Sequence, residues 1–200
     1  MLNSSLNREN SRLCRKVSRD STRSCIYVRD IINSIVEQIK LLKEIENIKI
    51  SLAMQTDFTL MNVFRLFEQQ GKIYCNSQDI QRCFNSLRLF PTALFLKRFV
   101  GLLTNFSSNE LPFSDFTFLF LPISPYYSQL LRNRANTSKP FSPETVSLLQ
   151  ALLHKHLDLY RFISVLYTSI DRDSTAIRNC FNIFDIDNKG CIGEYEVMYI

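Results

Sequence analysis

The chain has 200 residues, of which 46% are hydrophobic and 12% aromatic, and its formal net charge is +5. This length allows one large or two small helical domains with a real hydrophobic core. Only four glycines are present, and no glycine-rich nucleotide-binding motif occurs. The composition therefore argues against a phosphate-cradling loop, and because no Ser/His/Asp or Cys/His constellation stands out, we expect no enzymatic activity.

The six cysteines are scattered without a CxxC pair, and the only two histidines are His154 and His156. Zinc sites need clustered ligands, so none is expected. The polar amino-terminal sequence MLNSSLNREN lacks a hydrophobic signal core. No apolar run approaches the ~20 residues that a membrane span requires. We therefore expect a cytoplasmic protein with free thiols, and histidines that face solvent because they lie two residues apart on a helix.

Residues 1–24 form a predicted basic arm, which accounts for +4 of the net charge. The six basic residues recur every three or four positions and would form one stripe on a helix; they are Arg8, Arg12, Arg15, Lys16, Arg19 and Arg23. Such a stripe suits an acidic surface such as tubulin. A solvated, disordered tail is the alternative. Nucleic acid is disfavoured as a partner because no RNA-binding signature accompanies the charge.

From Cys25 to about Ala53, isoleucine and leucine recur at spacings of three and four, which predicts a long amphipathic helix. Shorter helices are predicted over 58–67 and 77–89. A further helix is expected to start at Pro91, since proline fits the first turn of a helix.

The second half of the chain opens with a predicted linker over 122–143, which is rich in proline, serine and asparagine. A second long helix is predicted from Glu144 to about Ile170, and a last helix over about 175–184.

An internal repeat appears when the sequence is shifted by 117 residues. The shift places Phe64, Leu66 and Phe67 over Phe181, Ile183 and Phe184, and it places Lys72 over Lys189. Each copy is therefore a long helix followed by a helix–loop–helix. The first copy, 25–121, continues into a second helix–loop–helix. The second copy, 144–200, stops at Ile200 before that counterpart.

The strongest motif is DIDNKGCIGEYE, residues 185–196. A twelve-residue calcium loop places oxygen ligands at positions 1, 3, 5, 7, 9 and 12, and a glycine at position 6. Asp185 and Asp187 take positions 1 and 3, and the backbone carbonyl of Cys191 takes position 7. Glu196 provides the bidentate carboxylate of position 12. Gly190 takes position 6, where the chain must turn with positive φ.

Lys189 at position 5 departs from this pattern, because lysine has no acceptor atom. Its backbone or a water would replace the missing ligand, so we expect one weak Ca²⁺ site. The alternative is an empty loop kept for packing. The loops 68–79 and 104–115 have lost most ligands: Ile73 replaces the glycine of position 6 in the first, and Asp79 at position 12 is one methylene shorter than glutamate. Neither is expected to bind calcium.

These loops resemble those of the EF-hand family, which includes calmodulin and troponin C. The stretch from about 52 to 127 resembles divergent EF-hand proteins of ciliated protists, through Phe90-Pro91-Thr92, Phe120-Leu121-Pro122 and Pro125-Tyr126-Tyr127. The resemblance implies an all-α fold: an EF-hand pair after a long helix, then a second long helix and a third, unpaired hand. In the pair, Cys75 and Leu111 at position 8 of their loops would meet in a short ladder.

The resemblance implies a calcium-responsive interaction protein that binds a partner helix in a groove, with a possible place in cilia or the cytoskeleton. The rival interpretation is a structural EF-hand scaffold of a cytoskeletal or ciliary assembly that never responds to calcium. In either case Ile192, at position 8 of the third hand, lacks a counterpart in the chain. We therefore expect that hand to pair in trans, or the chain to be part of a four-hand parent.

Overall fold

The computed structural model describes residues 22–68, 71–104, 110–137 and 139–169, together with 178, 181–182, 185 and 189–191. The chain divides into two compact units, 41–161 and a second made of 1–40 with 162–200, and each is treated by itself. The described part is mostly helical with one two-stranded sheet, which confirms the predicted helical class. The basic arm up to residue 21, and most of the predicted helix 175–184, lie outside the described residues.

The first half of the chain follows the predicted order of elements. It consists of α2 (Thr22–Met54), α3 (Leu60–Phe67), β1 (Tyr74–Asn76) and α4 (Ser77–Ser86). Helix α3 begins after Thr59, whose hydroxyl accepts the Asn62 N–H, and it buries four apolar residues one helical turn apart, Leu60, Val63, Phe64 and Phe67. The apolar residues that recur every three or four positions in the sequence are therefore the residues that α3 buries.

A second helix–strand–helix follows the first. It consists of α5 (Ala93–Leu103), β2 (Glu110–Pro112) and α6 (Phe113–Thr117), so α5 starts two residues after Pro91. Strands β1 and β2 pair antiparallel with Cys75 opposite Leu111, and both side chains are fully buried. The predicted pairing of these two residues is confirmed. The Phe113 N–H also donates to the Ile73 carbonyl, at 3.3 Å, and ties the two loops together.

The predicted linker contains a helix, α7 (Pro125–Arg132), with Pro125 in its first turn. The N–H groups of Ile123 and Ser124, just before α7, donate to the Glu46 carboxylate on α2 at 2.9 and 3.4 Å. The segment is thus part of the packed unit 41–161. Helix α8 (Pro143–Ser169) follows.

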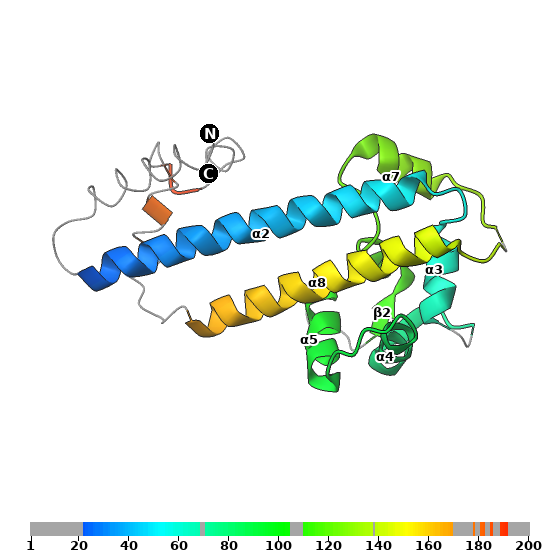
Figure 1. Cartoon of the computed structure of the whole chain (residues 1–200), viewed down its shortest axis with the longest axis horizontal. Coiled ribbons are helices and arrows are strands. Elements are labelled where there is room, and N and C mark those ends of the chain that lie inside the picture. Colours follow the sequence, from blue (N-terminus) through cyan, green and yellow to red (C-terminus); the bar gives the residue numbers. More distant parts are fainter. Residues whose placement is uncertain are drawn as a thin grey trace. The chain divides into compact units, whose positions relative to one another are not determined.

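Phenylalanine rings fill the core of the unit 41–161. The Phe67 and Phe116 ring centroids lie 5.0 Å apart and those of Phe58 and Phe120 6.0 Å apart, so α3 and α6 meet through aromatic contacts. On the other side of α5, Phe95 packs edge-on against Tyr160 of α8 at 4.3 Å. Figure 1 shows α3, α4 and α5 grouped beside α8 within this unit.

Arg134 closes the carboxyl end of α2. Its guanidinium donates hydrogen bonds to the carbonyl of Ala53 in the last turn of α2 and to those of Gln55 and Phe58 in the turn that follows. Burial lowers the pKa of Arg134, and the nearby Asp57 carboxylate opposes that shift. A residue far along the sequence therefore fixes the turn between α2 and α3.

A second polar contact joins α8 to the end of α6. The His156 Nε2 lies 3.2 Å from the Leu119 carbonyl, so this nitrogen carries the proton, and the ring is half-buried. The prediction that both histidines face solvent is wrong for His156, because α8 packs against the helices there; His154 is exposed and pairs with Asp158. Burial, and then the charge of Lys49, lower the pKa of His156 to about 4.

Replacing Arg134 by methionine keeps the stem but removes every donor, leaving three carbonyls without the guanidinium. We expect the free energy of unfolding in urea to fall by about 2 kcal/mol. The control is Arg132→Met, since Arg132 is exposed and makes no hydrogen bond or ion pair within the described part of the chain. A change within about 0.5 kcal/mol is expected there. Equal losses in the two variants would contradict the capping role.

His156 makes stability fall on the acid side of neutrality. The unfolded chain protonates this ring near 6.5, whereas the folded chain does so near 4. Its contribution is therefore complete above about pH 6.5, is lost progressively as the pH falls to about 4, and then levels off, with a total on the order of 3 kcal/mol. Chemical denaturation across this range should show a smaller slope for His156→Gln than for the wild type, while His154→Gln should leave the slope unchanged.

Candidate metal centre

The carboxylate of Asp185 organises the turn of the predicted calcium loop. Its Oδ1 accepts the Lys189 N–H at 2.9 Å and its Oδ2 accepts the Gly190 N–H at 2.8 Å, and the residue is buried. The Asp185 N–H donates to the Phe181 carbonyl at 2.9 Å, as in a helix that ends at the loop. Position 1 of the loop therefore holds the backbone of positions 5 and 6.

Gly190 has φ of +80°, which confirms the positive φ predicted at position 6. No atom lies within 4 Å of the place where a Cβ would stand, so the backbone conformation, and not lack of space, favours glycine. Cys191 is exposed with a free thiol. Asp187 and Glu196 lie outside the described residues, so the structure places two of the four predicted ligand residues.

The described residues fit one half of a calcium site. Asp185 still has acceptor capacity after taking two N–H groups, because a carboxylate has about four lone-pair sites. Lys189 is exposed. Among the described residues no three His, Cys, Asp or Glu side chains form a cluster able to hold a metal. A complete site at Asp185, Asp187, Cys191 and Glu196 stays a prediction.

In the loop 68–79, the position-12 carboxylate serves as a helix cap. Asp79 is buried, and its Oδ2 accepts the Asn76 N–H at 3.1 Å, while the Asn76 amide oxygen accepts the Gln78 and Asp79 N–H groups, each at 2.9 Å. This reciprocal arrangement is a capping box, and it starts α4 directly after β1.

The protein's own cations surround this carboxylate. Arg82 forms a hydrogen-bonded ion pair with Asp79, and Lys72 Nζ lies 4.0 Å from its Oδ2. A second buried carboxylate, Glu68, lies close enough that its charge, after burial and the charge of Asp79, helps raise the pKa of Cys75 to about 12. The position-5 lysine thus brings a positive charge close to the position-12 carboxylate.

The turn of this loop also differs from the predicted pattern. Positive φ occurs at Gly71, two residues before Ile73, and the Ile73 side chain is 81% exposed. In this loop the residue with positive φ is therefore Gly71 at position 4, and Ile73 at position 6 does not need that conformation. In the sequence, the lysine at position 5 of both copies indicated that a side-chain cation could lie beside the loop carboxylates.

The loop 104–115 is described only at its two ends. Thr104 is buried and its hydroxyl donates to the Val100 carbonyl at 3.1 Å, so it continues α5. Asp115 at position 12 accepts the Ser114 hydroxyl at 3.1 Å. These roles are local hydrogen bonds within the chain.

Comparison with known proteins gives no relative for this chain. No protein-family model, no curated protein and no solved structure matches it. Across the described helices, none is long and apolar enough to cross a membrane.

The Lys72–Asp79 pair should be measurable in a double-mutant cycle with Lys72→Met and Asp79→Asn. We expect a coupling of about 1 kcal/mol in the free energy of unfolding, because Asp79 is buried while Lys72 is partly exposed. A matched cycle with Lys97→Met, an exposed lysine on α5, should give no coupling with Asp79→Asn. Coupling of the same size at Lys97 would show that the effect is only net charge.

Proposed function

We propose that this chain is a non-catalytic EF-hand interaction module in which the loop 185–196 binds one calcium ion. The ligands would be the carboxylates of Asp185, Asp187 and Glu196 and the carbonyl of Cys191. The observation that carries the proposal is the Asp185 carboxylate, buried and fixed by the N–H groups of residues 189 and 190 around a positive-φ glycine.

The unit 41–161 supports the EF-hand interpretation through the placement of its elements. In each of the loops 68–79 and 104–115, the strand occupies positions 7 to 9 and the following helix begins at position 10. The buried pair Cys75 and Leu111 stands at position 8 of both. The strand and the following helix thus begin at the same positions in both loops, which favours a helix–loop–helix of the same kind in each.

Part of the loop 185–196 already has a fixed conformation without an ion. Two N–H bonds orient the Asp185 carboxylate, and Gly190 lets the chain reverse without strain. The chain therefore has less conformational entropy to lose at this end of the loop. When bound, the ion supplies a positive charge shared by ligands from both ends of the loop, which couples the flanking helices.

A calcium-independent structural scaffold is the second candidate. Lys72 and Arg82 beside Asp79 favour it, since one loop already has its position-12 carboxylate neutralised by protein cations. The two functions are compatible in one chain: a permanent pair in the unit 41–161 and one responsive loop at 185–196. A cytoplasmic, ciliary or cytoskeletal place, a basic arm on an acidic surface such as tubulin, and pairing of the third hand in trans belong to this proposal.

Calorimetric titration of calcium into the full chain should give one ion per chain with a dissociation constant near 10⁻⁵ M or weaker, on the order of the weak end of sensor loops. Lys189→Asp should tighten binding by about tenfold or more, because it removes a positive charge and adds a ligand. Glu196→Gln should abolish it.

The matched control is Asp79→Asn, which changes the same position of the loop 68–79. It should leave both stoichiometry and affinity unchanged, since that carboxylate serves Asn76 and Arg82. Two or more ions per chain would contradict the assignment of the loops 68–79 and 104–115, and no heat of binding with any variant would leave the scaffold as the function.

A further inference from the structure

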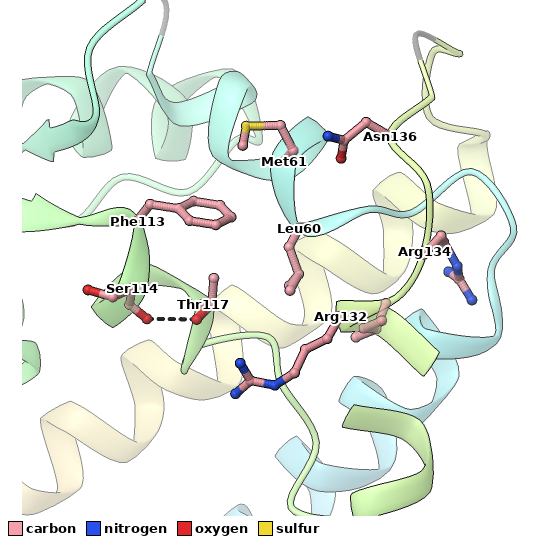
Figure 2. Close-up of a pocket in the computed structure, with 9 residues that line it drawn as sticks. Leu60, Met61, Phe113, Ser114, Thr117, Arg132, Arg134 and Asn136 are labelled. Atoms are coloured by element: carbon pink, nitrogen blue, oxygen red, sulfur yellow. Dashed lines mark hydrogen bonds between the residues drawn. The ribbon is translucent and has the colours of Figure 1, made fainter. Parts of the chain in front are cut away.

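A half-open pocket of about 410 Å³ lies between α3, α6 and the segment that follows α7. Its apolar side chains are Leu60 and Met61 on α3, Phe113 on α6 and Leu131 on α7. Figure 2 shows Leu60, Met61 and Phe113 around the opening. Arg132 and Arg134 complete it on one side. All of these residues belong to the unit 41–161.

The walls of the pocket are held in place by contacts outside it. The Asn62 amide donates to the Thr137 hydroxyl at 3.3 Å, and Arg134 bonds the carbonyls at the end of α2, so the segment after α7 is tied to both neighbouring helices. Phe113 packs edge-on against Phe64 at 5.1 Å. The pocket is therefore formed before any ligand binds, which lowers the entropic cost of binding.

The hydroxyls of the lining are already used. Thr117 donates to the Ser114 carbonyl at 2.6 Å, and Ser114 donates to the Asp115 carboxylate at 3.1 Å. Because Arg134 donates to backbone carbonyls, ligand recognition falls to the apolar walls, the Arg132 guanidinium and the Asn136 amide.

The charge of the pocket is positive. Among the described lining residues two are arginines and none is acidic. Arg134 donates to backbone carbonyls and has the Asp57 carboxylate nearby, so Arg132 is the guanidinium left for a ligand. Arg132 is exposed and has no hydrogen bond or ion pair within the described residues, and in the view of Figure 2 its guanidinium extends toward Thr117. A hollow of mixed lining, with apolar side chains on its α3 and α6 walls and a guanidinium at its mouth, is complementary to an apolar group that carries a carboxylate.

We propose that this pocket binds a protein segment in which a large apolar side chain stands next to a carboxylate. The volume suits one or two side chains, and three of the lining residues, Ser114, Arg132 and Asn136, are exposed. A small molecule usually buries most of its surface, which such an open site does not provide. The apolar side chain would contact Leu60 and Phe113, and Arg132 would donate two hydrogen bonds to the carboxylate.

This binding is independent of calcium and of the proposed function. The contacts that shape the pocket join protein groups to one another, and none of the lining residues belongs to the loop 185–196. Its success or failure is therefore separate from that of the calcium titration.

The test is fluorescence anisotropy of the full chain with a labelled peptide Gly-Ser-Phe-Asp-Ser-Gly. We expect a dissociation constant on the order of 10–100 µM, unchanged by a calcium chelator. Replacing Phe by Gly or Asp by Asn in the peptide should weaken binding about tenfold each. In the protein, Arg132→Gln should weaken binding about tenfold, whereas Arg98→Gln, an exposed arginine of α5 outside the pocket, should have no effect.

A second variant introduces a competing carboxylate. Met61→Glu should abolish binding of the Phe-Asp peptide, and the control Met54→Glu, at an exposed methionine of α2, should not. Circular dichroism confirms that each variant folds. No binding of the peptide, equal affinity for the Asp and Asn peptides, or equal effects at Arg132 and Arg98 would overturn the proposal. Binding of anionic vesicles or single-stranded RNA that depends on Arg132, without peptide binding, would also overturn it.

Discussion

The short ladder between β1 and β2 sets the register on which the unit 41–161 depends. It has only three residue pairs, and the central pair, Cys75 with Leu111, is fully buried. A slip by one residue would turn both side chains to the opposite face of the strands and remove them from the core. The ladder also fixes where the following helices start, since α4 and α6 begin at the next residue of each strand. Asn76, the last residue of β1, is also the N-cap of α4 and forms the capping box with Asp79.

The loop 68–79 is held together by charged and polar groups of the chain itself. A metal between two ends of a loop neutralises carboxylates that would otherwise repel one another. Here Arg82 and Lys72 provide that charge from within the chain, and the capping box satisfies the Asn76 N–H as well. A buried carboxylate is costly unless it is paired and hydrogen-bonded, and Asp79 is both. All of the contacts that hold Asp79 are therefore made by groups of the chain itself.

Sequence periodicity predicted the helices α2, α3 and α8 and the contact of Cys75 with Leu111, because these depend on local spacing and on the internal numbering of the loops. It did not predict α7. Its proline-rich composition is typical of a linker, and the carboxylate near its start comes from Glu46, 77 residues earlier. Pro125 followed by apolar residues at Tyr127 and Leu131 was the available signal.

Other parts of the structure depend on contacts between residues that are distant in sequence, and a local sequence pattern could not predict these contacts. Burial of His156 requires the carbonyl of Leu119, and the cap of α2 requires Arg134. The pocket joins side chains from three separate segments of the chain. In the candidate calcium site, the turn at Asp185 and Gly190 followed from the motif, since each residue type has one steric or hydrogen-bonding role there.

The two position-5 lysines illustrate why equal sequence need not mean equal function. Lys72 is partly exposed and lies beside a buried carboxylate, so its charge is less screened by water than that of a fully exposed lysine. Lys189 is exposed, and water and salt screen its charge from the interior of the loop. The same residue at the same position therefore lies beside a buried carboxylate in one copy and in solvent in the other, and burial is what separates the two environments.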